Sequence, residues 1–471
     1  MKKLLPYSLL LLSYITIAQT PCVNGMAGAY PCSGMDLQSR ISLTTMNAFA
    51  GNDSWGWTDP QDGKEYGIMG LDNGTAFIDI TDPINPIYLG KLPTHTDPSI
   101  WRDIKVYNDH AFIVSEASGH GMQVFDLTRL RNVPNPPATF TEDAHYNGIG
   151  NCHNIVINEE TGFAYAVGAS STNGGGPIFI NIQNPTNPTF AGDFTNDFYC
   201  HDAQVVIYNG PDTDYTGREI LLGSNEDFVS IVDVTDKNNP QAISRGFYAN
   251  TAYTHQGWLT EDQRYFILGD EIDEEASGFN TRTIIFDLLD LDNPQVAFYY
   301  EADNESIDHN GYVLGDEFFL SSYRAGLRIL DITDLANGNM TETKFFDTYP
   351  DNNGTSYNGA WSVYPYFASG NVVISDIDRG FFVVKASEDL STEDNAIAEF
   401  SIYPNPANHT VNIASKNTPV TQVELFNLLG QRIFSQNFSE NLIEKIDVSA
   451  FSSGMYVMKI NGVTTKRLLI K

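Results

Sequence analysis

The chain has 471 residues, 42% of them hydrophobic and 12% aromatic, and this composition excludes a wholly disordered protein because a large apolar core can form. It carries 26 basic and 59 acidic residues, a net charge of −33, so we expect neither nucleic acid nor an anionic membrane surface as a partner. The length predicts two or three domains.

Residues 1–18 are typical of a secretory signal peptide. Lys2 and Lys3 precede an apolar run from Leu4 to Ile17, and cleavage is expected after Ala18. The run is short for a membrane span, and no other segment approaches ~20 apolar residues, so no transmembrane segment is expected. We therefore expect an extracellular protein, either secreted or held at the outer-membrane surface.

Four cysteines in an exported chain favour disulfide formation. Cys22 and Cys32 lie in a glycine-rich N-terminal lead, residues 19–40, and are predicted to pair with each other. Cys152 and Cys200 each precede a histidine. For these two, the sequence leaves open a disulfide between repeats, two buried thiols, or metal ligands.

Residues 41–388 contain seven copies of one pattern, an apolar strand that ends in Asp or Asn and is followed by turn residues. Copies recur every 44 to 55 residues, which is typical of a β-propeller and not of a helical solenoid. The residues at the marker position are Asp79, Asp126, Asn181, Asp233, Asp287, Asp331 and, in a degraded last copy, Lys385.

We therefore predict an all-β chain, with a seven-bladed β-propeller over 41–388 followed by a small C-terminal β-sandwich. Four strands can be placed in most repeats, but the seventh has no clear fourth strand. The apolar segment at 41–46 is expected to supply that strand and to close the ring, because closure removes exposed sheet edges.

The first strands of four consecutive repeats carry histidine at one aligned position. We expect these strands to line the central channel, so the histidines and the residues beside them should form a ligand-binding ring at one channel mouth. The histidines are His153, His201, His255 and His309, and the residues beside them are Asn154, Asp202, Gln256 and Asn310, with Arg102 and Asp103 in the second repeat.

Neighbouring neutral imidazoles and carboxylates are suitable ligands for zinc or another divalent transition metal. With an open coordination position, such a site would activate water. The alternative is structural, since a residue repeated once per blade also makes a repeated hydrogen bond along a polar channel. The acidic run Asp270–Glu275 is a second candidate cation site, for calcium or simply a solvated loop.

Residues 389–397 are polar and acidic and predict a linker, whereas residues 398–471 show short alternating strands typical of a small β-sandwich. This module resembles the type A C-terminal sorting domain of the type IX secretion system of Bacteroidota. The resemblance implies export by that machinery, usually with removal of the module. It is carried by Tyr403-Pro404-Asn405-Pro406-Ala407, residues 424–431, residues 453–457 and the basic end at 466–471.

Residues 20–388 resemble the choice-of-anchor B proteins, whose blades carry LVIVD-type repeats. Lys385 departs from the acidic position of those repeats. The resemblance implies a constant propeller body with a variable surface anchor, and it brings no catalytic residues. The matching stretches are 21–28, 101–106, 120–127, 153–157, 201–205 and 254–258.

From these features we expect an exported binding module for a cation, glycan or protein. The alternative is a metal-dependent hydrolase or lyase built on the four histidines, with Arg102 positioning an anionic substrate. A structural surface-layer component is a third possibility. A catalytic metal would require at least three of these side chains to converge on one point at ~2.0–2.1 Å.

Overall fold

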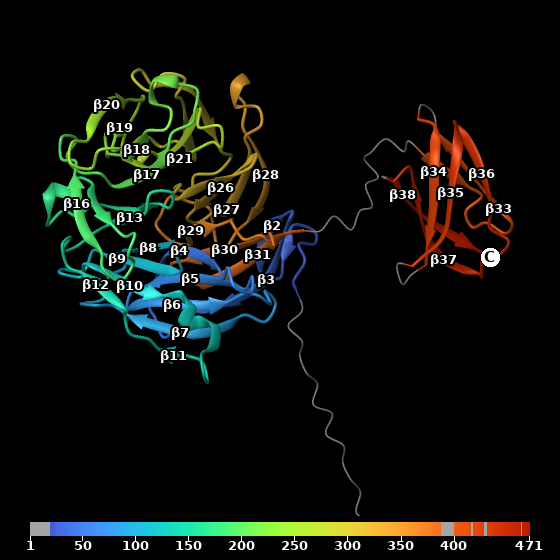
Figure 1. Cartoon of the computed structure of the whole chain (residues 1–471), viewed down its shortest axis with the longest axis horizontal. Helices are drawn as coiled ribbons and strands as arrows, with labels where there is room; N and C mark the ends of the chain where they lie inside the picture. The colour runs from blue at the N-terminus through green and yellow to red at the C-terminus, as the bar shows by residue number, and fades with distance from the viewer. Residues whose placement is uncertain (1–18, 388–399, 416–417, 428–430, 463) are drawn as a thin grey trace, which may run out of the picture. The chain divides into compact units, whose positions relative to one another are not determined.

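The computed structural model describes residues 19–387, 400–415, 418–427, 431–462 and 464–471 (Figure 1). The chain divides into two compact units, Met1–Ser387 and Glu388–Lys471. The predicted signal peptide and the predicted linker at 389–397 lie outside the described residues. None of the described helices is long and apolar enough to cross a membrane.

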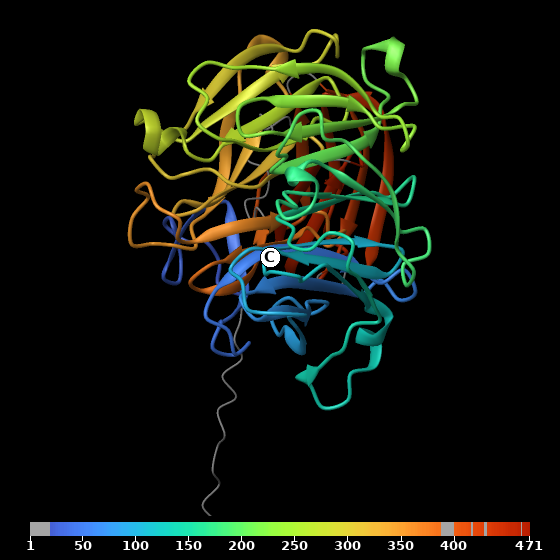
Figure 2. The same cartoon turned by 90° about the vertical axis from the view of Figure 1, so that its left-hand side faces the viewer.

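The first unit is a β-propeller, in which seven small antiparallel sheets surround a channel (Figures 1 and 2). Each inner strand contacts the inner strand of the next sheet, and the last contacts the first, so the ring is closed. The inner strands are β4 (Gly51–Thr58), β8 (Arg102–Tyr107), β13 (Asn154–Asn158), β17 (Asp202–Ile207), β21 (Thr254–Leu259), β25 (Gly311–Leu314) and β29 (Ala360–Tyr364).

The second and third strands of each blade are buried on both faces, because neighbouring blades pack against them. The second strands are β5 (Glu65–Leu71), β9 (His110–Ser115), β14 (Phe163–Val167), β18 (Glu219–Ser224), β22 (Tyr265–Asp270), β26 (Glu317–Ser322) and β30 (Asn371–Asp376). The third strands are β6 (Gly74–Asp79), β10 (Met122–Asp126), β15 (Ile178–Asn181), β19 (Val229–Asp233), β23 (Arg282–Asp287), β27 (Gly326–Asp331) and β31 (Gly380–Ala386).

The fourth strands form the outer edge of each blade, and in β24 burial alternates with exposure along the strand. They are β7 (Ile87–Pro93), β12 (Ala144–Tyr146), β16 (Thr189–Asp193), β20 (Gln241–Gly246), β24 (Gln295–Glu301), β28 (Thr341–Phe346) and β3 (Met35–Ile41). Short strands extend two edges: β11 (Ala138–Thr139) beside β7, and β2 (Tyr30–Ser33) with β1 (Met26–Ala27) beside β28.

The repeat marker residue has a structural role at the end of each third strand. In six blades its side chain accepts a hydrogen bond from the backbone N–H two residues later, which starts the turn to the fourth strand. Examples are Thr81 N–H to Asp79 Oδ1 at 3.0 Å and Gln183 N–H to Asn181 Oδ1 at 3.0 Å. The same bond is made by Asp126, Asp233, Asp287 and Asp331.

The ring closes with an N-terminal strand, but not at the residues that the sequence predicted. Strand β3, Met35–Ile41, pairs with β31, whereas the predicted closing segment 41–46 is mostly a turn. Ser42 Oγ accepts the Thr45 N–H at 3.2 Å, and this local bond competes with strand pairing. Leu43 and Met46 are nevertheless buried, which explains the apolar pattern.

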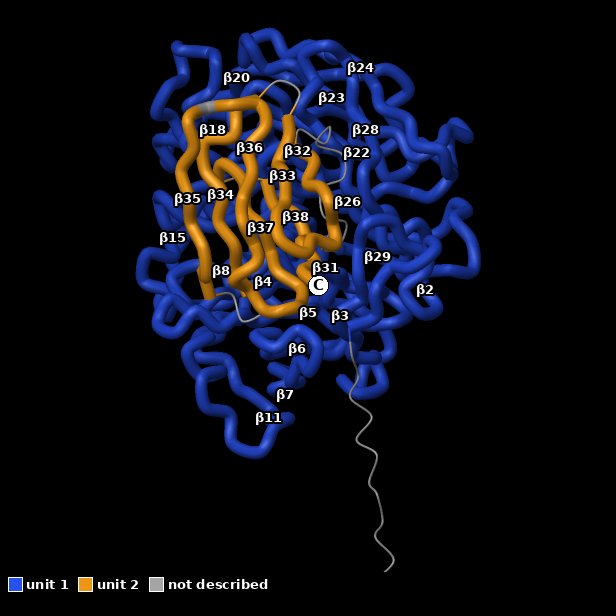
Figure 3. The backbone as a smooth tube through the Cα atoms, turned by 90° about the vertical axis from the view of Figure 1, so that its right-hand side faces the viewer, with its two compact units in different colours: residues 1–387 blue, residues 388–471 orange. Residues whose placement is uncertain are grey.

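The second unit consists of a three-stranded and a four-stranded sheet around one apolar core (Figure 3). The first sheet has β32 (Phe400–Tyr403), β33 (Thr410–Ser415) and β36 (Ile443–Asp447). The second has β35 (Arg432–Asn441), β34 (Val420–Phe426), β37 (Gly454–Ile460) and β38 (Thr464–Ile470), in that spatial order.

Candidate functional site

The four predicted histidines meet at the end of the channel where the inner strands begin. They line a cavity of about 220 Å³, here called the histidine pocket. Each histidine lies within two residues of the start of its inner strand, so the repeat itself places the rings in a row. The other lining residues are Trp101, Glu116, Tyr199, Tyr253, Glu271, Ile272 and Trp361.

The imidazole rings follow one another in sequence order around the channel. The ring centroids are 4.1 Å apart for His153 and His201, 4.5 Å for His201 and His255, and 4.3 Å for His255 and His309. Four rings at such separations cannot all be charged, because like charges this close repel strongly. The row is therefore built for neutral imidazoles.

Burial and hydrogen bonding agree with neutral rings. Burial lowers the pKa of His201 and His255 well below the usual value, and it lowers the pKa of His309 to about 3. Nδ1 of His201 donates to the His255 carbonyl at 3.2 Å, and Nδ1 of His309 donates to the Trp361 carbonyl at 2.6 Å. The proton is thus on Nδ1, and Nε2 of both rings is a free lone pair.

Glu271 provides a carboxylate next to two of these imidazoles, His255 and His309, of which His309 presents its Nε2 lone pair. Its oxygens lie 3.7 Å from Nε2 of His255 and 3.7 Å from Nε2 of His309, and it accepts a hydrogen bond from the Tyr323 hydroxyl at 2.8 Å. Burial raises the pKa of Glu271 to about 7. Buried lone pairs facing a carboxylate are unfavourable unless a proton or a cation lies between them.

A metal ion fits this arrangement. One ligand atom each from His201, His255 and Glu271 lie within 4.8 Å of one another. At ~2.0–2.1 Å from zinc, two ligands are at most about 4.2 Å apart, and the 3.7 Å separation of His255 and Glu271 satisfies this limit. Nδ1 of His255 has no partner among the described residues, so no hydrogen bond at Nδ1 fixes the tautomer of this ring.

His153 ends the row and is paired differently. Its Nδ1 lies 2.6 Å from Glu116 Oε1, an ion pair when the ring is protonated. A carboxylate on Nδ1 fixes the ring orientation and leaves Nε2 directed away from Glu116. His153 can therefore serve as an additional ligand or as a proton acceptor beside the ion.

An aromatic cleft of about 330 Å³ shares Glu271, Trp101 and Trp361 with the histidine pocket. Tyr323 and Tyr357 complete its aromatic lining. Trp101 is 42% exposed, so a ligand in solution can reach its ring. A molecule in this cleft would lie next to an ion held by Glu271.

The structure places Arg102 away from the site for which it was predicted. Arg102 is 1% exposed and does not line the histidine pocket. Its guanidinium donates to the Leu71 carbonyl, to Thr94 Oγ1 and toward His120 Nε2 at 2.9 Å. Arg102 occupies the same position in its repeat as the histidines do in theirs. Its hydrogen bonds to Leu71, Thr94 and His120 hold the side chain away from the histidine pocket, so it does not reach a substrate bound there.

The polar residues that directly follow the histidines in the sequence are buried along the channel and do not line the histidine pocket. Gln256 bonds the backbone of Gly311 in both directions, and Asn310 donates to Ser362 Oγ at 3.3 Å. These contacts join neighbouring inner strands and are not directed at a ligand. Asn154 and Asp202 are likewise at least nine-tenths buried.

A charged layer closes the middle of the channel. Lys105 Nζ lies 2.6 Å from Asp103 Oδ1 and 3.6 Å from Asp53 Oδ2, and Asp202 interacts with it electrostatically. We call Asp53, Asp103, Lys105 and Asp202 the Lys105 layer. Asp103 was predicted at the channel mouth but belongs to this layer, where it also accepts the Ile155 N–H at 2.8 Å.

The predicted calcium run is distributed over several environments. Glu271 faces the histidines, Asp273 pairs with Arg282 at 2.6 Å, and burial raises the pKa of Glu274 to about 9. Among the described residues, Glu271 is the one member of this run that joins a cation-sized ligand group. Calcium binding by the whole run stays a prediction.

The cysteines are resolved by the structure. Cys22 and Cys32 form the predicted disulfide, which ties the N-terminal lead to the edge of blade β25–β28. Cys152 and Cys200 are buried free thiols, and burial raises the pKa of both. Neither lines the histidine pocket.

Sequence reasoning missed Glu116, Glu271 and Tyr323 as partners of the histidines. Each of the three directly follows the last residue of a second strand, β9, β22 or β26. The second strand ends where the inner strand of the same blade begins, which brings these side chains close to the histidines. Comparing the ends of second strands across the repeats would have found Glu116 and Glu271 at equivalent places.

Comparisons with known proteins identify the tail. Among solved structures, PorZ, a surface component of the type IX secretion system of Porphyromonas gingivalis, aligns over 87% of this chain and 58% of its own, with 12% identity and a TM-score of 0.45. The Myceliophteria thermophila Cps50 (Swd1) β-propeller domain aligns over 75% of this chain and 100% of its own, with 10% identity and a TM-score of 0.47.

Two curated proteins share short stretches with the chain. The ulvan lyase NLR42 of Nonlabens ulvanivorans is 32% identical over 80 residues, and an endo-acting ulvan lyase of Formosa agariphila is 29% identical over 100 residues. The alignments cover 17% and 20% of this chain and 15% and 19% of the respective lyases.

Residues 401–471 match the secretion system C-terminal sorting domain family. This is the module that the sequence motifs predicted, and it marks proteins exported by type IX secretion. The C-terminal unit is thus a type IX sorting domain, and the chain is a β-propeller protein exported to the cell surface or the extracellular space.

Proposed function

We propose that the propeller is a binding module that holds a divalent transition metal ion in the histidine pocket. The observation that carries this proposal is the convergence of the neutral imidazoles of His201 and His255 with the carboxyl group of Glu271. Two imidazoles and one carboxylate are suitable ligands for zinc, with His309 and His153 available as further donors.

The ion would give the pocket its ligand preference. Three protein ligands leave at least one coordination position open, and an anionic group such as a carboxylate or sulfate can occupy it. The aromatic cleft beside Glu271 offers Trp101 and Trp361 as faces for the rest of that ligand. Without the ion, Glu271 and Glu116 would repel such an anion.

Elemental analysis of the purified chain tests this proposal. After incubation with zinc, manganese or iron and dialysis, we expect about one ion per chain. His201→Ala and His255→Ala should abolish retention, whereas His110→Ala should retain it, because His110 bonds the Asn108 carbonyl outside the pocket. Metal content no higher in the wild type than in the two pocket variants would overturn the assignment.

A second candidate function is a metal-dependent hydrolase or lyase using the same ion. It is favoured by the open coordination position, the Glu116–His153 pair and the adjoining cleft. Because two ulvan lyases share short stretches with this chain, ulvan is the first polysaccharide to test. Formation of unsaturated or reducing ends by the zinc-loaded wild type, but not by zinc-treated His201→Ala, would support catalysis, and their absence would leave binding alone.

A further inference from the structure

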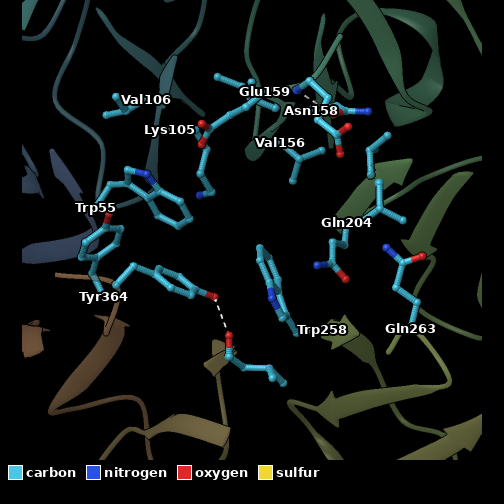
Figure 4. Close-up of a pocket in the computed structure, with 16 residues that line it drawn as sticks. Trp55, Lys105, Val106, Val156, Asn158, Glu159, Gln204, Trp258, Gln263 and Tyr364 are labelled. Atoms are coloured by element: carbon cyan, nitrogen blue, oxygen red, sulfur yellow. Dashed lines mark hydrogen bonds between the residues drawn. The ribbon is translucent and has the colours of Figure 1, made fainter. Parts of the chain in front are cut away.

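A second cavity, larger than the histidine pocket, lies at the opposite end of the channel. It has a volume of about 460 Å³ and is lined by the later residues of the inner strands and by the loops that follow them. We call it the tryptophan pocket, because Trp55 and Trp258 form two of its walls (Figure 4). Tyr364 and Tyr366 extend the aromatic surface.

The two indoles are held rigidly but keep their polar edges free. Trp258 packs edge-on against Tyr312 at 4.9 Å, and Trp55 packs against Tyr312 at 5.7 Å and Tyr364 at 5.1 Å. No described residue accepts a hydrogen bond from either indole N–H. By contrast, Trp57, two residues further along β4, is buried and donates to Asp109 at 3.0 Å.

Gln204 adds a hydrogen-bond donor to the lining of the cavity (Figure 4). Its Oε1 accepts the Leu259 N–H at 2.8 Å, and this bond fixes the amide orientation. Its Nε2 has no partner among the described residues, although the side chain is only 8% exposed. This nitrogen is not among the buried side-chain atoms that lack a partner, so solvent in the cavity can reach it and a ligand there can accept a hydrogen bond from it.

The charges around the cavity disfavour an anion. Lys105 is the one cation in the lining, and its charge is neutralised by Asp103 and Asp53 in the layer beneath. Glu159 and Glu160 stand at the rim and face no lysine or arginine in the lining. A ligand here therefore meets aromatic faces, hydrogen-bond donors and rim carboxylates, with no free positive charge.

We propose that the tryptophan pocket binds an uncharged saccharide of one or two pyranose rings. The apolar C–H face of a pyranose stacks on an indole, its hydroxyls accept from Gln204 and the indole N–H groups, and the rim carboxylates accept from further hydroxyls. The volume lies within the range of small-molecule sites. This site is separate from the histidine pocket and does not depend on a metal ion.

Isothermal titration of the full chain with cellobiose, maltose, lactose and laminaribiose tests the proposal, with digalacturonate as the anionic comparison. We expect at least one neutral disaccharide to bind and digalacturonate to bind more weakly. Trp55→Phe and Trp258→Phe remove the indole N–H and part of the stacking surface, and each should weaken binding ~3- to 10-fold. Gln204→Glu keeps the acceptor for Leu259 and removes the free donor, with a similar loss expected.

Trp57→Phe is the matched control, because Trp57 lies on the same strand and does not line the pocket. It should bind like the wild type, and EDTA should leave the affinity unchanged. The proposal is overturned if none of the four disaccharides binds, if digalacturonate binds more tightly than all of them, or if the Trp57 variant loses as much affinity as the pocket variants.

Discussion

Lys105 offers the sharpest test of how the channel is stabilised. The side chain is 8% exposed, and its ammonium lies between Asp103 and Asp53 and 4.6 Å from the centre of the Trp55 ring. Burial alone would lower the pKa of Lys105, but the surrounding carboxylates raise it to about 12, so the side chain stays charged. We predict that Lys105→Met strongly destabilises the propeller.

The expected cost follows from the buried charge that remains. Removing one partner of a buried ion pair costs about 3–5 kcal/mol, because the other charge is left uncompensated. Methionine keeps most of the lysine stem, so lost packing contributes little. Lys64→Met is the matched control: Lys64 lies 3.5 Å from Asp62, both side chains are more than a third exposed, and such surface pairs contribute about 0–1 kcal/mol.

Urea unfolding followed by tryptophan fluorescence provides the assay. All five tryptophans lie in the first unit, so the signal does not report unfolding of the sorting domain. The cost of Lys105→Met should also increase with pH, because without the ammonium the pKa of Asp103 rises above its unfolded value, and a raised carboxyl pKa lowers stability as pH increases. Equal free energies of unfolding for the Lys105 and Lys64 variants would refute this reasoning.

Three further predictions concern buried groups outside the channel. Burial raises the pKa of Asp376 from 3.8 to about 6, so its contribution should fall by about 3 kcal/mol as pH rises from about 4 to 7, and Asp376→Asn should flatten the pH profile of urea unfolding by that amount. Cys22→Ser with Cys32→Ser opens a link between residues ten apart and should lower the unfolding free energy by about 2–3 kcal/mol, whereas an unchanged midpoint would mean that the lead does not stabilise the ring. Cys152 and Cys200 should resist iodoacetamide in the folded protein and gain two alkyl groups in urea by intact mass, whereas no gain in urea would indicate a disulfide.

The fold was predictable from sequence because its repeat has a local physical cause. In six of the seven blades an Asp or Asn side chain caps the turn after the third strand, as Asp79 and Asn181 show, so the same residue types recur in the sequence. The closing strand was misplaced because Leu43 and Met46 are apolar for another reason: they are buried from within a turn. An apolar pattern indicates that residues are buried, but it does not say whether they form a strand or a turn. Here the hydrogen bond from the Thr45 N–H to Ser42 Oγ stabilises the turn.

The histidine row was predictable for the same reason, since one register position repeats on adjacent inner strands. The partners of the histidines, Glu271 and Tyr323, were not predictable. They lie just after the ends of second strands, and their distance from the histidines depends on how the blades pack against one another. Arg102 shows that an aligned position in the repeat does not by itself determine where a side chain lies. It occupies the position of a histidine, yet acceptors on neighbouring loops determine where its longer side chain goes.

The two pockets should act independently, because the Lys105 layer separates them within one channel. His255 belongs to one pocket and Trp258 to the other, three residues apart along β21, a span of about 10 Å. Changes at that separation without shared partners are additive within about 0.5 kcal/mol. We therefore expect His255→Ala to abolish zinc retention and leave disaccharide affinity unchanged. Trp258→Phe should weaken disaccharide binding ~3- to 10-fold and leave zinc retention unchanged, and the double variant should show both losses. Disaccharide binding that weakens together with zinc loss would instead mean that the layer transmits strain from one mouth to the other, and the charged residues between them would then be the coupling element.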